Sequence, residues 1–182
     1  MTLASANIVL DFWFREITPK AWFQKSEAFD AEVAARFGEV LNAAVRGELW
    51  SWRTTAEGRL AEIIVIDQFS RNIHRGRPES FSHDPVALIL AQTAVELGAD
   101  KALDPDARAF LYMPYMHSES PIVHLEAVRL FSQPGLERNL DFEMRHKAVI
   151  DRFGRFPHRN EILGRASTPE ELEFLLTPGS SF

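Results

Sequence analysis

Three short polar segments hold the residues that are best suited to do chemistry. They read SRNIHRGRP at 70–78, YMHSESP at 115–121 and RFGRFPHRN at 152–160. Seven of the 16 arginines lie between Arg71 and Arg77 or between Arg152 and Arg165, in a chain whose formal net charge is −6. Base composition of the gene is one explanation for the excess of arginine over lysine, but it does not explain the clustering. A guanidinium group binds carboxylate or phosphate with two parallel hydrogen bonds, so the clusters indicate an anion site.

The segment RFGRFPHRN predicts a rigid polar turn. Gly154 allows the chain to reverse at the end of a helix, and Pro157 disfavours helix at the residue before it. We expect Phe153 and Phe156 to anchor the turn in the core. Part of the positive charge complements the dipole of the preceding helix. The other polar side chains predict ligand contacts, with Arg155, Arg159 and Asn160 as binding residues and His158 as a catalytic acid or base.

Asp67 is expected to be buried. It completes an i, i+3, i+4, i+7 series of apolar positions that begins at Leu60, and a buried carboxylate must be paired or protonated. Arg71 follows one helical turn later, within reach of an ion pair. The simpler interpretation is a structural ion pair between Asp67 and Arg71 that fixes the following loop. The alternative is that Asp67 orients Arg71 toward a ligand, with Arg75 as a second binding residue.

His117 and Glu119 lie in a predicted connection between two helices. Pro114 should end the first helix, and Ser120 followed by Pro121 should begin the second. A histidine and a carboxylate at this spacing suit proton transfer, so both residues are candidate catalytic groups. The H-x-E spacing is by itself a weak signal.

His146 lies on the apolar stripe of a predicted helix. A histidine in that position is typical of a satisfied core residue, and the alternative interpretation puts it at the wall of a polar pocket as a ligand-binding residue. A metal site built from His117, Glu119 and either His146 or His158 is a third hypothesis for these groups. The histidines show no zinc-protease spacing, and we assign no metal ligand.

Helices must position these segments. A capping residue precedes a proline at Thr18, Asp84, Asp104, Ser120 and Thr168, which predicts five helix starts. Apolar residues recur every three or four positions in 30–45 and 139–153. The run IIVI at 63–66 could form a buried strand, but the length and the Ala and Glu content of 55–69 favour a helix packed on several sides. We predict one all-α domain over residues 1–182, with seven to nine helices.

Composition excludes several classes of protein. The 182 residues are 46% hydrophobic and 25% charged, as in ordinary globular domains. The net negative charge disfavours nucleic-acid binding, and no apolar run is long enough to span a membrane. The absence of cysteine excludes disulfides and thiolate chemistry, and it agrees with a cytoplasmic location. We expect no cofactor, because no Walker or Rossmann glycine loop and no nucleophile elbow occur.

Several longer motifs carry a resemblance to a known family. They are VLDFWF, the WF at 22–23, DQFSRNIHRG, FLYMPYMHSES, RFGRFPHRN and LGRAST. Together they resemble the bacterial family catalogued as domain of unknown function 924, over residues 9–182. The resemblance implies an array of antiparallel helix pairs similar to tetratricopeptide-repeat proteins, and it implies no activity. The sequence departs from the family pattern at His124, where glutamine is expected, and this puts ligand specificity in doubt if the position lines a pocket.

Two functional hypotheses follow. The first is a polar pocket for a small anion that carries a phosphate or a carboxylate, with enzymatic activity left open. The alternative is a tetratricopeptide-like scaffold that binds a peptide or protein partner in a groove. The hypotheses differ in geometry: the first requires the three polar segments to converge on one concavity, and the second requires each segment to pair locally.

Overall fold

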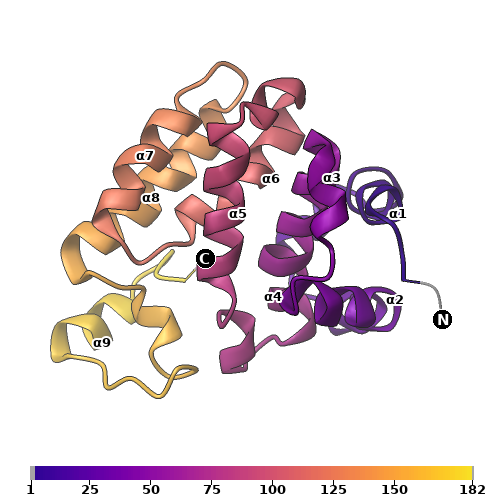
Figure 1. The fold of residues 1–182 in the computed structure, drawn as a ribbon. Helices are drawn as coiled ribbons and strands as arrows, with labels where there is room; N and C mark the ends of the chain where they lie inside the picture. Colours follow the sequence, from indigo (N-terminus) through magenta and orange to yellow (C-terminus); the bar gives the residue numbers. More distant parts are fainter. Residues whose placement is uncertain (1–2, 182) are drawn as a thin grey trace.

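The structure, a computed structural model, describes residues 3–181 and is all-helical as predicted (Figure 1). The α-helical segments of this part of the chain are α1 (Ala6–Asp11), α2 (Glu27–Val45), α3 (Ala56–Ile64), α4 (Ser70–Ile73), α5 (Asp84–Glu96), α6 (Pro105–Met116), α7 (Pro121–Phe131), α8 (Glu137–Phe153) and α9 (Pro169–Leu175). A π-helical turn at Val65–Phe69 joins α3 and α4 into one helix. The segments within 3–181 therefore form eight helices without a strand, which confirms the predicted fold class.

The continuous helix α3–α4 lies at the centre of the core. Every side chain from Leu60 to Ser70 is buried, because α1, α2, α5 and α6 all pack against this helix. The apolar face of α2 supplies Val33 and Phe37, as the spacing in 30–45 predicts. The prediction of a helix around IIVI is thus confirmed. The π-helical turn adds a residue to one turn of this helix, and such turns are frequent at functional sites.

Three of the predicted helix starts, at Asp104, Ser120 and Thr168, are found where the sequence indicates. Asp104 accepts a hydrogen bond from the backbone N–H of Ala107, and Thr168 forms a capping box with Glu171. The prediction at Thr18 is wrong, because only a turn and a short 3₁₀ segment at Ala21–Phe23 follow it.

The predicted start at Asp84 is right in position but wrong in the role of the side chain. Helix α5 begins at Asp84, yet this carboxylate caps no backbone N–H group. It binds Arg71 and Arg159 instead. An ion pair with two guanidinium groups takes the place of the capping hydrogen bond.

The prediction that Pro114 ends a helix is also wrong. Helix α6 continues through Pro114 to Met116. Proline removes one N–H donor and crowds the carbonyl of Phe110, but every residue from Ala109 to Met116 is buried, so tertiary packing offsets this cost. The helix therefore ends later than expected, and His117 becomes its C-cap residue.

The helices are arranged in two groups on either side of α5 (Figure 1). Helices α1 to α4 form one group, and α7 and α8 form the other with α9 below them. Helix α6 packs against α7, and α7 packs against α8, each pair being joined by a short connection. Helices joined by short connections are antiparallel neighbours. The resemblance of this arrangement to tetratricopeptide repeats stays a prediction. Within residues 3–181, no helix has the length and apolar character that a membrane span requires.

Candidate functional site

A polar cavity of about 350 Å³ opens where the three polar segments meet. Its wall includes six of the residues predicted to contact a ligand: Arg71, Arg75, His117, His146, His158 and Arg159. These residues come from α4 and the turn after it, from the end of α6, from α8 and from the 3₁₀ turn Pro157–Arg159. The fold thus brings together residues that lie far apart in the sequence.

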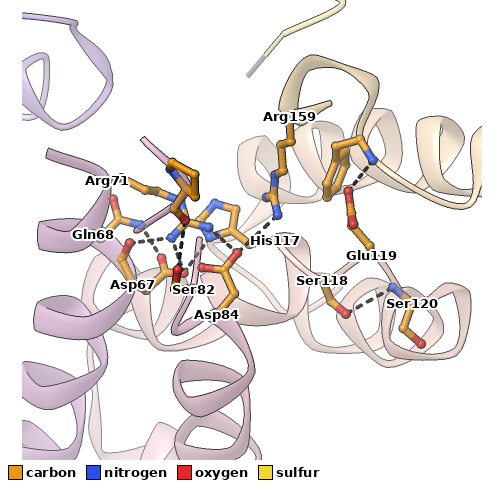
Figure 2. A network of polar contacts seen from close by, with 12 residues as sticks. Asp67, Gln68, Arg71, Ser82, Asp84, His117, Ser118, Glu119, Ser120 and Arg159 are labelled. Atoms are coloured by element: carbon orange, nitrogen blue, oxygen red, sulfur yellow. Dashed lines mark hydrogen bonds and ion pairs between the residues drawn. The ribbon is translucent and has the colours of Figure 1, made fainter. Parts of the chain in front are cut away.

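Asp67 forms a hydrogen-bonded pair with His117, which lines the cavity (Figure 2). Asp67 Oδ1 lies 2.8 Å from His117 Nδ1, and the Asp67 side chain is 1% exposed. Burial opposes ionisation of this carboxyl group, but Arg71 and His117 outweigh burial and lower the pKa of Asp67. An ionised carboxylate only accepts hydrogen bonds, so His117 Nδ1 carries the proton. Burial in turn lowers the pKa of His117.

Two aspartates and two arginines form a chain of ion pairs beside this pair (Figure 2). Arg71 Nη1 lies 3.2 Å from Asp67 Oδ1, and Arg71 Nη2 lies 2.9 Å from Asp84 Oδ2. Arg159 Nη1 lies 3.2 Å from the same oxygen of Asp84. Burial disfavours the Arg71 cation, but the charges of Asp67 and Asp84 outweigh it and raise the pKa of Arg71. The chain of ion pairs holds both guanidinium groups in fixed positions.

Arg159 is the most unusual member of the site. Its guanidinium carbon lies 4.6 Å from the centres of both the Phe81 and the Phe156 rings, so the group is held between two aromatic faces. The residue is 6% exposed, and burial together with the charge of Arg71 lowers its pKa to about 10. Within residues 3–181 its Nε is buried without a hydrogen-bond partner. A buried cation with an unused donor is well suited to bind an anion.

Two further histidines line the cavity in their neutral form. His146 Nδ1 lies 2.8 Å from the carbonyl oxygen of Phe142, which fixes the proton on that nitrogen. Burial lowers the pKa of His146 to about 3 and that of His158 to about 4. At neutral pH both rings are therefore part of the cavity wall without adding charge to it.

Arg155 is not among the described residues that line the cavity. Arg155 binds Glu171 through Nε at 2.6 Å and through Nη2 at 2.7 Å. Glu171 is also the glutamate of the capping box of α9, so the guanidinium group of Arg155 is held at the start of that helix. Arg75 does line the cavity, but its Nε and Nη2 both bind Asp30, which Asn72 also contacts. Arg75 therefore brings its charge to the cavity with two of its nitrogens already bound to Asp30, and its role as a binding residue stays a prediction.

Glu119 and Asn160 are also absent from the described part of the cavity wall. Glu119 binds both terminal nitrogens of Arg165 and accepts the backbone N–H of Phe156 at 2.7 Å. Asn160 is 1% exposed and contacts Arg165 and Ser167. These contacts join the turn at 156–167 to the loop after His117, and the catalytic role of Glu119 and the binding role of Asn160 stay predictions.

His124 lies beneath the site and does not line the cavity within the described residues. Its Nε2 lies 2.8 Å from the carbonyl oxygen of Ser118, and its Nδ1 lies 2.7 Å from Glu143 Oε1. Both side chains are fully buried, and burial raises the pKa of Glu143. The residue that departs from the family pattern therefore holds the loop at Ser118, next to His117, and does not line the described cavity.

The sequence did not reveal two members of the site. Asp84 precedes a proline, which is the usual pattern of a helix cap. The pattern does not show that the Asp84 carboxylate forms ion pairs with Arg71 and Arg159 instead. Phe81 lies in a loop without periodicity, so nothing indicates that it stacks on Arg159. The metal hypothesis gains no support, since within the described residues no three His, Asp or Glu side chains are grouped closely enough to hold an ion.

Comparisons with known proteins agree with the resemblance noted in the sequence. A family model described as "Bacterial protein of unknown function (DUF924)" matches residues 9–179. The solved structure of a protein of unknown function from Agrobacterium tumefaciens is 40% identical, with a TM-score of 0.89, and the match covers 94% of this chain and 96% of that chain. No curated protein matches the chain.

Proposed function

The chain belongs to the DUF924 family, and because membership brings no activity with it, we propose from the geometry that the cavity binds a small anion bearing a phosphate or carboxylate group. One observation carries the proposal. Lys25, Arg71, Arg75 and Arg159 line the described wall of the cavity, whereas no Asp or Glu side chain does. The carboxylates that balance these charges lie behind the guanidinium groups, so the surface that faces a ligand is cationic.

Arg159 and Arg71 are the binding groups in this proposal. Burial strengthens the attraction between a guanidinium group and an anion, because the local dielectric is low. Arg159 is also held rigidly between two rings, so little side-chain entropy is lost when it binds.

His117 acts as a general base in the same proposal. With the proton on Nδ1 and a hydrogen bond to Asp67, the lone pair of Nε2 is available to accept a proton from water or from a hydroxyl group of the ligand. The buried carboxylate orients the ring and stabilises the imidazolium that forms. Among the described residues, the His117 ring is hydrogen-bonded to Asp67 and not to a serine or threonine hydroxyl, so in this proposal the base acts on the ligand or on water.

The scaffold hypothesis remains the alternative. It requires the polar segments to pair locally, and Glu119, Arg155 and Asn160 do pair in this way. It does not account for the cationic wall of the cavity. A cytoplasmic location stays a prediction.

Titration with inorganic phosphate tests the proposal. Phosphate should raise the melting temperature, and Arg159→Lys should weaken phosphate binding about tenfold, because a planar pair of donors is replaced by a point charge. Arg155→Lys is the matched control, since Arg155 binds Glu171 away from the cavity and its replacement should leave binding unchanged. Absence of binding to the unaltered protein, or an equal loss in both variants, would contradict the proposal.

A further inference from the structure

A second, larger cavity adjoins the polar one. It is a groove of about 860 Å³ that runs between α6 and α8 and is lined mostly by apolar side chains, among them Phe110, Met116, Phe142 and Val149. Large apolar groups remain open to solvent in and beside it, since Phe142 is 37% exposed and Phe23 is 63% exposed. Apolar surface of this extent commonly marks a binding site.

The two cavities share part of their walls. Trp22, Phe23, Met113, His117 and His146 line both of them. The groove therefore adjoins the site that holds Arg71 and Arg159, and His117 lies on the wall that the polar and the apolar cavities have in common.

We propose that the two cavities hold one amphiphilic ligand, with a phosphate or carboxylate head at Arg159 and Arg71 and an apolar chain in the groove along α8. The assignment of the head depends on the function proposed above. The groove selects the chain, because burying each methylene group against Phe142 and Val149 is favourable. The bond that joins head and chain then lies against His117, the residue proposed as the base.

A series of alkyl phosphates measured by calorimetry tests this inference. Inorganic, ethyl, butyl and hexyl phosphate carry the same head, and they are used below the concentrations at which they form micelles. Affinity should rise by about fourfold for each methylene that enters the groove. Hexanol, which has the chain without the head, should bind far more weakly than hexyl phosphate.

Two variants of α8 locate the chain. Ala148 is exposed and lines the groove, so Ala148→Trp should fill the groove and abolish the gain with chain length while phosphate itself still binds. Met144 is exposed on the same helix but does not line the described groove, and Met144→Trp should leave the series unchanged.

The possible failures can be told apart. If phosphate binds but longer chains bring no gain, the inference is wrong and the proposed function stands. If neither phosphate nor any alkyl phosphate binds, both are wrong. If hexanol binds as tightly as hexyl phosphate, or if Ala148→Trp keeps the dependence on chain length, the head and chain do not occupy the two cavities as proposed.

Discussion

Asp67 Oδ1 lies 2.8 Å from His117 Nδ1, although fifty positions separate the two residues in the sequence. The contact joins the π-helical turn at the centre of the core to the end of α6. Arg71 binds the same aspartate and links it to Asp84. A single buried carboxylate therefore fixes both a candidate base and a candidate anion-binding group.

Replacing Asp67 should destabilise the protein strongly. Asp67→Ala leaves the Arg71 cation without one of its two carboxylates in a buried position, and the loss of one partner in such a pair costs about 3–5 kcal/mol. The free energy of unfolding from urea titration measures the effect. A loss below about 0.5 kcal/mol, the usual range for surface changes, would mean that solvent replaces the carboxylate.

His124 should tolerate glutamine but not an apolar residue. Glutamine has an N–H donor for the carbonyl of Ser118 and an oxygen or N–H group for Glu143, so His124→Gln should cost less than about 1.5 kcal/mol. His124→Leu leaves both partners buried and unsatisfied, and each such group costs about 1–3 kcal/mol. Thermal unfolding of the two variants measures the difference. Equal losses would show that packing, and not hydrogen bonding, determines the choice of residue.

The helical fold could be predicted because local signals agree along the chain. The spacing of Val33 and Phe37 places them on one face of α2, and that face is buried in the structure. The capping box at Thr168 is equally local. The continuation of α6 through Pro114 was not predictable, because the buried packing of Ala109 to Met116 that offsets the missing N–H group is a tertiary contact.

The candidate site could be predicted only in part. Residue types predicted that arginine and histidine side chains of three segments gather around one cavity, but they do not show which guanidinium groups are already paired. Arg155 and Arg159 lie four positions apart in the same turn, yet one binds Glu171 and the other faces the cavity. That difference depends on where α9 packs, which is a tertiary contact without a local signal in the sequence.

Stability should fall as the pH is lowered from 6.5 to 4. The pKa of His146 is about 3 and that of His158 is about 4 in the folded protein, below the ordinary value of 6.5. Between these values the unfolded chain binds more protons than the folded chain, so the free energy of unfolding decreases with falling pH. Each histidine contributes up to ~1.4 kcal/mol per pH unit. Urea titrations in phosphate-free buffers measure the slope.

A variant isolates the contribution of one ring. His146→Gln cannot titrate in this range, so its slope between pH 6 and pH 4 should be smaller than that of the unaltered protein by up to one bound proton. The comparison uses slopes, and a uniform loss of stability in the variant does not affect it. An unchanged slope would mean that His146 is protonated in the folded protein.

His117 should be neutral at pH 7.5, with its proton on Nδ1. Burial lowers its pKa, and the hydrogen bond to Asp67 fixes the tautomer, so Nε2 keeps the lone pair that a general base requires. Nitrogen-15 NMR of the imidazole ring distinguishes the protonated from the unprotonated nitrogen directly. Asp67→Asn supplies the control, because its amide can donate to Nδ1 and should move the proton to Nε2. A proton on Nε2 of the unaltered protein would exclude His117 as the base.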